Sequence, residues 1–401
     1  GLGIFSKGDD THTPVENQYS NSEVKSLLTS SKGINIEINN DFLKSYNIPK
    51  TSTEVDNKTN ILYPAQIINF VSQRYMNNDL FDDLLVFIKG SMETVLKNVS
   101  QLPDDKSLIG DGLFWLSNAF EIYSYIRTNI SNHDLYQQSN DLVGATLINM
   151  FNTWMKKMIS FIRYDINISN ILIGSPSNIG KDGENDKKVT HLLVFFYEIM
   201  KFAELYRIEH DITHKIIGNI LAFANALCVN DLCIKFYGLN WKLGYQINKN
   251  IKVLDEWLLK HDIAVDPRED MVQLRQISTF LQLRMNRMSD LEIAQEFCYR
   301  LNPVQLQTIL KKYKPSNTEP EVSPEITNFL ANMIKKNKGQ AGSLTLKMEL
   351  HNFSNPIVDE TYNPVRRIRV IDNSTVQDPT TVSHSSYTLP TVDQIVHIMS
   401  S

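Results

Sequence analysis

Cysteine is scarce in this chain of 401 residues, which contains only Cys228, Cys233 and Cys298. Three cysteines in a chain of this length form no disulfide framework, so the composition indicates a reducing compartment. Cys228 and Cys233 lie in the apolar sequence ALCVNDLCIKF, and no second cysteine pair completes a tetrahedral metal site. We therefore interpret the cysteines as small buried apolar residues.

An excess of positive charge is also missing. The formal net charge is −5 and the isoelectric point is near 6.0, whereas proteins that bind nucleic acid or membranes directly usually carry a basic excess. No apolar run reaches the ~20 residues of a membrane-spanning helix, and the first residues, GLGIFSKGDD, lack the plan of a signal peptide. These absences predict a cytosolic chain with no transmembrane segment and no direct contact with nucleic acid.

Alternating patterns typical of strands are nearly absent, whereas apolar residues recur at helical spacing along most of the chain. Tyr63-Pro64 opens a long helical stretch that ends at 102–105, and the stretch 134–172 is long enough to link two bundles. Asn302-Pro303-Val304-Gln305 predicts a helix start, because asparagine caps free amides, proline suits the first helical position and glutamine completes a capping box. Further helices are expected at 111–130, 190–209, 211–236, 247–261, 267–285 and 289–300, and after Ser323-Pro324 and Leu389-Pro390. The sequence therefore predicts an all-α fold of packed helical bundles.

A chain of this length usually forms two or three cores, because a single core stops growing near ~250–300 residues. The polar, glycine-containing loop 174–190 marks an expected boundary. We expect the C-terminal part to pack back on the bundles. The predicted parts are an extended polar arm at 1–60 with short helices around 21–30 and 39–46, helical subdomain I at 61–185, helical subdomain II at 186–337, and an irregular arm with a last helix at 338–401.

Residue combinations that carry catalysis are missing. His210 and His214 have the spacing of metal ligands, but Asp211 stands where a metalloprotease has its catalytic glutamate and no third ligand follows. Two histidines at a helix junction are the favoured interpretation. The segment 174–181 differs from a phosphate-binding loop, because its glycine spacing is one residue too long and Asp182 replaces the magnesium-binding hydroxyl. The sequence predicts a non-catalytic binding module without metal or cofactor.

Three residues make the candidate binding surface. Trp241 and Tyr245 share one helical face, Lys242 follows Trp241, and both aromatic residue types are favoured at interface hot spots. A core position for Trp241 is an equally weighted alternative, and Tyr245 is the stronger candidate for an exposed contact. The short basic clusters at 335–338 and 366–369 are interpreted as solvated faces.

Several stretches in a fixed order carry a family resemblance. Each stretch alone is weak, but together they resemble the dilute-type globular tail of fungal class V myosins. The stretches are LYPAQIINFVSQRYM (62–76), GLFWLSNAFEIYSYI (112–126), FNTWMKKM (151–158), LCVNDLCIKFYGLNWKLGYQINKNIKVLDEWL (227–258), ISTFLQLRM (277–285), CYRLNPVQLQTILKKY (298–313) and YTLPTVDQIVHIM (387–399).

The resemblance implies an elongated molecule of two helical-bundle subdomains joined by a long helix, similar to the rods of vesicle-tethering complexes. It also implies a C-terminal arm that returns across the first subdomain. Such tails hold cargo adaptors, while a separate motor domain hydrolyses ATP on actin. The resemblance therefore implies no active site in this chain.

Two cargo surfaces are implied as well. Residues 142–152 match an organelle-adaptor surface of the family. Asn149 and Asn152 agree with the family pattern, whereas Leu142 and Thr146 depart from it. A Rab-type GTPase surface is matched around Phe223 and Gln246, where Gln246 agrees and Phe223 replaces a tyrosine. These departures argue against vacuole and secretory-vesicle cargo.

The pattern is nearer to the divergent budding-yeast heavy chain that transports mRNA and cortical ER. That motor reaches RNA through a coiled-coil adaptor bound to its tail, which implies an actin-associated chain in the cytoplasm at the bud or cell cortex. Trp241, Lys242 and Tyr245 are then the predicted adaptor contact. The alternatives are an organelle or secretory-vesicle tail that binds Rab GTPases and organelle receptors and, from another class, a subunit of a vesicle-tethering complex.

Overall fold

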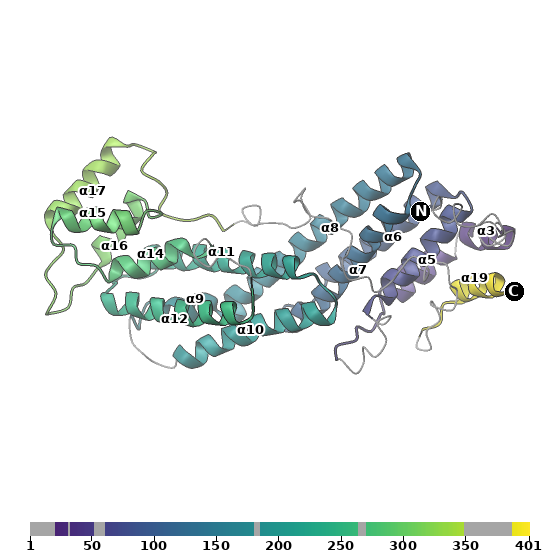
Figure 1. Ribbon diagram of the computed structural model, residues 1–401, viewed down its shortest axis with the longest axis horizontal. Helices are drawn as coiled ribbons and strands as arrows, with labels where there is room; N and C mark the ends of the chain where they lie inside the picture. The colour runs from purple at the N-terminus through teal and green to yellow at the C-terminus, as the bar shows by residue number, and fades with distance from the viewer. Residues whose placement is uncertain (1–20, 31–32, 52–60, 180–184, 264–269, 349–386) are drawn as a thin grey trace. The chain divides into compact units, whose positions relative to one another are not determined.

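The computed structural model describes residues 21–30, 33–51, 61–179, 185–263, 270–348 and 387–401 (Figure 1). Helices make up the regular structure of these residues, which contain no strand, and one isolated parallel bridge joins Leu239 to Tyr313. The predicted all-α class is therefore confirmed. The helices are α3 (Ser22–Thr29), α5 (Tyr63–Asn77), α6 (Phe81–Ser100), α7 (Ser107–Asn129), α8 (His133–Phe161), α9 (Ile168–Ile173), α10 (Asn185–Leu205), α11 (His210–Ile234), α12 (Trp241–Lys260), α14 (Val272–Leu281), α15 (Met288–Phe297), α16 (Pro303–Lys312), α17 (Pro324–Lys336) and α19 (Pro390–Ser400), with π-helical turns at Ile36–Phe42 and Ile162–Ile166.

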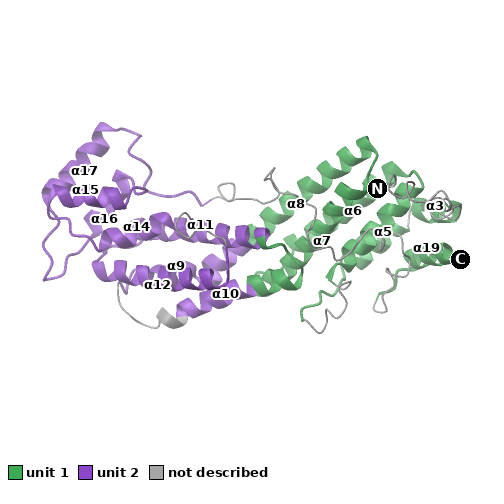
Figure 2. Ribbon diagram, in the orientation of Figure 1, with its two compact units in different colours: residues 1–157, 199–210, 355–401 green, residues 158–198, 211–354 purple. Residues whose placement is uncertain are grey.

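The chain forms two compact units, coloured separately in Figure 2. Unit 1 contains residues 1–157, 199–210 and 355–401, and unit 2 contains residues 158–198 and 211–354. The division falls inside α8, inside α10 and after the first residue of α11. The four-part division inferred from composition stays a prediction, since composition reports polarity along the chain rather than contacts.

The core of unit 1 surrounds α5, whose 15 residues are all buried. Helices α6 and α7 pack against it. Gln73 of α5 is buried with two partners: the Tyr125 hydroxyl donates to Gln73 Oε1 at 2.7 Å, and Gln73 Nε2 donates to Asn77 Oδ1 at 2.8 Å. Such hydrogen bonds offset the cost of burying amides.

The last helix is held by residues more than 300 positions earlier in the chain. Helix α19 packs on α3 (Figure 1), and the Glu37 carboxylate accepts hydrogen bonds from the backbone amides of Thr391 at 2.7 Å and Val392 at 3.1 Å. A carboxylate at this end satisfies free amides and suits the helix dipole. Tyr387 stacks on Tyr46 with ring centroids 5.0 Å apart. The helix start predicted after Leu389 is confirmed at Pro390.

In unit 2, α11 is a core helix. Among the described residues it alone has the length and composition of a membrane span, and 83% of its apolar window is buried inside the protein. Helix α12 packs on α14 and on α9. Asn250 of α12 donates to the Leu172 carbonyl at 3.0 Å, which satisfies one carbonyl at the end of α9.

Two helix breaks differ from the prediction. The stretch expected from Tyr63 to the break at 102–105 is interrupted after Asn77, and Asp79 has a left-handed φ of 56°. The stretch 134–172 is interrupted at Asn167, with φ of 58°. Asparagine and aspartate tolerate this backbone conformation, and the apolar stripe continues on both sides, so periodicity alone did not reveal the breaks.

The capping box at Asn302 is confirmed, with Gln305 N donating to Asn302 Oδ1 at 2.9 Å and Asn302 N donating to Gln305 Oε1 at 3.0 Å. Helix α17 begins at Pro324 as predicted, although no hydrogen bond caps it from the Ser323 side chain. The helix expected at 247–261 begins earlier, at Trp241, because Asn240 caps it.

Helices α7 and α8 approach closely at Gly112, where an added Cβ would lie 1.9 Å from Trp154 Nε1. That indole nitrogen donates to the Leu108 carbonyl at 2.9 Å. We expect Gly112→Ala to push the buried indole off its acceptor and to lower the free energy of unfolding by about 1–3 kcal/mol, measured by urea unfolding with far-UV circular dichroism.

Gly144→Ala is the matched control for that substitution. Gly144 also lies in a helix of unit 1, but its added Cβ would meet only the Tyr123 ring, nearest at the hydroxyl at 3.3 Å. Alanine favours helix over glycine by ~1 kcal/mol, so this variant should be as stable as the parent or more so. Equal stability of the two variants would contradict the proposed tight contact at Gly112.

Candidate adaptor-binding site

Two aromatic side chains project from the first turns of α12. Asn240 caps the helix by accepting a hydrogen bond from Leu243 N at 2.9 Å. Trp241 is 40% exposed and Tyr245 is 54% exposed, whereas Leu243 and Ile247 are buried on the opposite face. The core position weighed for Trp241 is thus excluded in this structure. Residues four apart on a helix are neighbours, so the two rings share one accessible face, next to the exposed Lys242.

A third exposed aromatic residue precedes α12. Tyr237 lies in the turn between α11 and α12 and is 89% exposed. The sequence analysis did not single it out, although an aromatic residue beside Gly238 in a turn between two apolar helices was a usable signal. We call Tyr237, Trp241 and Tyr245 the aromatic surface.

The turn that carries Tyr237 and leads into α12 is anchored to α16. Leu239 N donates to the Lys312 carbonyl at 2.8 Å, and Lys314 N donates to the Leu239 carbonyl at 2.7 Å. The Lys312 ammonium donates to the carbonyls of Cys233 at 2.6 Å and Phe236 at 2.7 Å. A cation is favourable where α11 ends with free carbonyls, while burial lowers the pKa of Lys312. The anchoring fixes where α12 begins.

The first turns of α12 lie directly on α14. A Cβ added at Gly244 would meet the Ser278 carbonyl oxygen at 2.7 Å and Leu281 Cβ at 2.8 Å. The Ser278 hydroxyl donates to the Gly244 carbonyl at 3.0 Å. Only glycine permits this approach of two backbones. The rings of Trp241 and Tyr245 therefore project from a packed helix rather than from a loop.

The predicted organelle-adaptor residues are also at the surface. Asn149 and Asn152 are exposed on α8, three residues apart and therefore on one face. Thr153 Oγ1 donates to Asn149 Oδ1 at 3.3 Å. Both amides can reach a partner.

The structure corrects the other two secondary candidates. Phe223 is 2% exposed within α11, and Gln246 is 7% exposed and donates to Asn250 Oδ1 at 3.3 Å. Phe223 belongs to a core helix, and Gln246 lies on the inner face of α12, one residue beyond the exposed Tyr245. Neither side chain is accessible to a partner in this structure, and a Rab-type GTPase surface in this region stays a prediction.

The described residues hold no group of three or more histidine, cysteine, aspartate or glutamate side chains that could bind a metal. His210 and His214 lie at the start of α11. The basic cluster 366–369 and the last residues of the loop 174–181 lie outside the described residues.

All three cysteines are free and buried. Burial raises the pKa of Cys233 and of Cys298 to about 11, and it raises the pKa of Cys228 further. Since the thiolate is the reactive form, these thiols are small apolar side chains in the folded chain.

We expect no thiol of the native chain to react with Ellman's reagent within minutes at pH 8, because burial both shields the thiols and keeps them protonated. Three thiols should react once guanidinium unfolds the chain. Absorbance of the released thionitrobenzoate counts them. Rapid reaction of even one thiol in the native chain would show that a cysteine is accessible.

The comparisons with known proteins identify the family of the chain. The DIL domain family matches residues 215–317, which run from α11 to the loop after α16. Myosin-4 of Saccharomyces cerevisiae (strain ATCC 204508 / S288c) is 30% identical over 355 residues, or 84% of this chain. The chain spans 22–23% of the length of the curated relatives it matches.

Solved structures cover nearly the whole chain. The globular tail of Myo4p is 27% identical, with a TM-score of 0.70, and covers 94% of this chain and 100% of that one. The Myo2 globular tail, solved in complexes with Mmr1 and with Smy1, is 25% identical, with a TM-score of 0.77, and covers 96% of this chain and 98% of that one. The match is to the tail and not to the ATPase motor domain. The chain belongs to the family of cargo-binding globular tails of class V myosins.

Proposed function

We propose that this tail binds a coiled-coil protein adaptor through its aromatic surface, and that the adaptor connects it to an RNA-binding protein and mRNA. Cortical ER is a second proposed cargo of the same actin-based motor. The observation that carries the proposal is the exposure of Trp241 and Tyr245 together on α12, a helix that packs closely on α14 at Gly244. The proposed location is the actin-associated cytoplasm at the bud or cell cortex.

The chemistry of this surface suits a helical protein partner. Tryptophan and tyrosine bury large rings at little entropic cost and keep a polar tip for water or a hydrogen bond. An amphipathic helix or a coiled coil can lay its apolar face across two such rings. The net charge of −5 fits a division of labour in which the adaptor, and not the tail, contacts phosphate.

Similarity alone does not choose between cargo classes. Sequence identity is slightly higher to the Myo4p tail (27%) than to the Myo2 tail (25%), whereas the TM-score is higher for Myo2 (0.77 against 0.70). The TM-score measures the packing that both tails share, so we give more weight to the accessible side chains. Their pattern supports the adaptor proposal.

An organelle or secretory-vesicle cargo is the second candidate function. The exposure of Asn149 and Asn152 on α8 favours an organelle receptor at that surface, while the burial of Phe223 and Gln246 removes the residues inferred for a Rab-type GTPase. The tethering-complex alternative has no support, because the family and structural matches described are to myosin tails.

Replacing Trp241 and Tyr245 together by alanine should weaken adaptor binding by ~2 kcal/mol or more, or roughly 30-fold, because buried aromatic anchors dominate interface energies. Proteins that co-purify with the tail would be identified by mass spectrometry. The coiled-coil protein among them would be purified, and its dissociation constant would be measured by isothermal titration calorimetry. The melting temperature should stay within a degree or two of the parent, since both rings are exposed.

The matched control is the double variant Tyr164→Ala with Tyr197→Ala, which removes two exposed tyrosines elsewhere in unit 2. It should bind the adaptor as the parent does. Sequencing of RNA recovered with the tail tests the cargo: enrichment of specific mRNAs that is lost in the Trp241/Tyr245 variant supports the proposal. Recovery of organelle receptors lost on changing Asn149 and Asn152 would favour the second candidate.

A further inference from the structure

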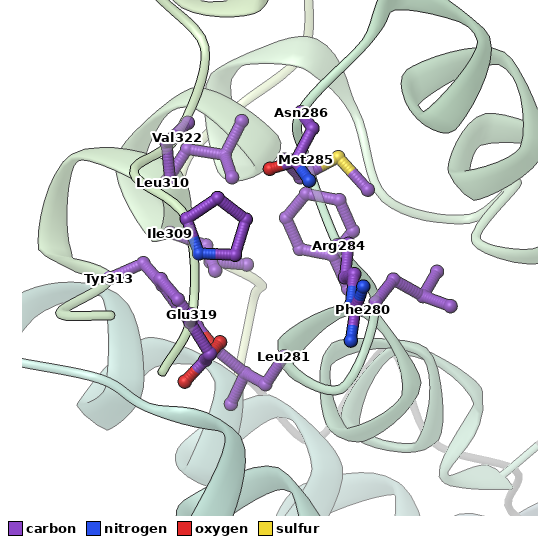
Figure 3. Close-up of a pocket in the computed structure, with 12 residues that line it drawn as sticks. Phe280, Leu281, Arg284, Met285, Asn286, Ile309, Leu310, Tyr313, Glu319 and Val322 are labelled. Atoms are coloured by element: carbon purple, nitrogen blue, oxygen red, sulfur yellow. The ribbon is translucent and has the colours of Figure 1, made fainter. Parts of the chain in front are cut away.

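A pocket in unit 2 carries no excess of charge. It opens between the end of α14, α16 and the loop that leads to α17 (Figure 3). Arg284 and Glu319, the two charged residues in its lining, have opposite charges and lie close enough to interact. Leu281 in its wall meets α12 at the buried Gly244. The pocket therefore does not extend the exposed side of α12 that carries Trp241 and Tyr245.

The exposed side of α12, by contrast, runs along the whole helix. Six exposed residues of this helix fall within an arc of about 100° around its axis, at ~100° per residue. We call them the outer face of α12, and they are Trp241, Lys242, Tyr245, Lys252, Glu256 and Leu259.

The outer face has apolar side chains at both ends. Trp241 and Tyr245 lie at its start, and Leu259, which is 80% exposed, lies at its end. Trp241 and Leu259 are five full turns apart, so their side chains point in the same direction about 27 Å from each other. A single exposed leucine is common, but Tyr245, Lys252 and Leu259 also follow one another at the heptad spacing on which two helices pack lengthwise. The pattern fits a partner helix that spans the whole outer face.

Positive charge lies between the two apolar ends. Residues 232–254 contain four lysines and no acidic residue, although the net charge of the chain is −5. Lys235 pairs with Asp231 at 3.5 Å, whereas Lys242 and Lys252 are exposed on the outer face. The next acidic residue, Asp255, accepts a hydrogen bond from Arg275 Nη1 of α14 at 2.6 Å. The outer face is therefore basic until Glu256, one turn before Leu259.

We propose that an acidic helix of the adaptor lies lengthwise along the outer face of α12. Its apolar residues contact Trp241, Tyr245 and Leu259, and its acidic residues pair with Lys242 and Lys252. Glu256 sets the direction of this helix, because an acidic residue opposite Glu256 would be repelled. The inference rests on the proposed function, since it extends the same interface to the far end of α12 and states the charge of the partner.

The same features disfavour two other occupants. A second copy of the tail, paired about a two-fold axis at the middle of the outer face, would bring Lys252 against its own copy, and like charges at an interface are unfavourable. RNA would bring phosphates against Glu256 and would leave Leu259 without an apolar contact. An acidic amphipathic helix matches both the charges and the apolar ends.

Charge reversal tests the acidity of the partner. Lys242→Glu with Lys252→Glu should weaken binding of the purified coiled-coil adaptor at least tenfold in isothermal titration calorimetry, and the loss should shrink at high salt, which screens exposed charges. Lys242→Arg with Lys252→Arg should keep most of the affinity. The matched control is Lys335→Glu with Lys336→Glu on the exposed end of α17, which changes the net charge equally and should bind as the parent does. An equal loss in this control would overturn the pairing with α12.

The far end of the outer face tests the lengthwise arrangement. Leu259→Ala should weaken adaptor binding about fivefold through lost apolar burial, whereas Ile293→Ala, at an exposed residue of α15, should not. Both variants should melt within a degree or two of the parent. Photo-crosslinking residues placed at positions 245 and 259 should capture adaptor residues about 14 apart in one helix, because two helices that run side by side have the same rise per residue. Capture of the same few adaptor residues from both positions would overturn the arrangement.

Failure of this inference is distinct from failure of the proposed function. If the Lys242/Lys252 and Leu259 variants bind within twofold of the parent while Trp241→Ala with Tyr245→Ala does not bind, the lengthwise helix is overturned and the aromatic surface stands. If all of these variants bind normally, the proposed function fails as well. Two results would overturn the assignment to an adaptor helix: binding of a 20-residue oligouridylate in fluorescence anisotropy, or a tail dimer in sedimentation velocity, if either is lost in Lys242→Glu with Lys252→Glu.

Discussion

The close approach of α12 to α14 at Gly244 constrains the segment that carries the proposed binding surface. A side chain at this position would collide with the Ser278 carbonyl oxygen and with Leu281. Glycine lets the two helices meet backbone to backbone, and the Ser278 hydroxyl then satisfies the Gly244 carbonyl. With one face of α12 fixed in this way, residues on its other face must point outward, and the rings of Trp241 and Tyr245 are held in place without contributing to the core.

A second contact holds the turn before α12. The Lys312 ammonium donates hydrogen bonds to the carbonyls of Cys233 and Phe236, and it thereby ties this turn to the end of α16. A recognition surface built on packed helices loses less entropy on binding than one built on a loop, and this favours an interface with few anchors.

The helical class, most helix positions and the capping box at Asn302 were predictable because they depend on local chemistry. Asn302 and Gln305 form the predicted capping box since its geometry spans only one turn. The breaks at Asp79 and Asn167 were missed because a single left-handed residue hardly disturbs an apolar stripe that faces one core. The hydrogen bonds from the start of α19 to the Glu37 carboxylate could not be predicted from local sequence, because the partners are more than 300 residues apart in the chain.

By itself, the sequence determined an all-helical binding module, the three buried cysteines and the ordered motifs of a class V myosin tail. Only the tertiary structure decided which candidates are accessible. Tyr245 and Gln246 are adjacent in the sequence and both were candidates, yet one is 54% exposed and the other 7%. The reason is physical. Helical periodicity gives only the angle between two residues around the helix axis, whereas the helices packed against α12, which are α14 and α9, decide which side of α12 is buried.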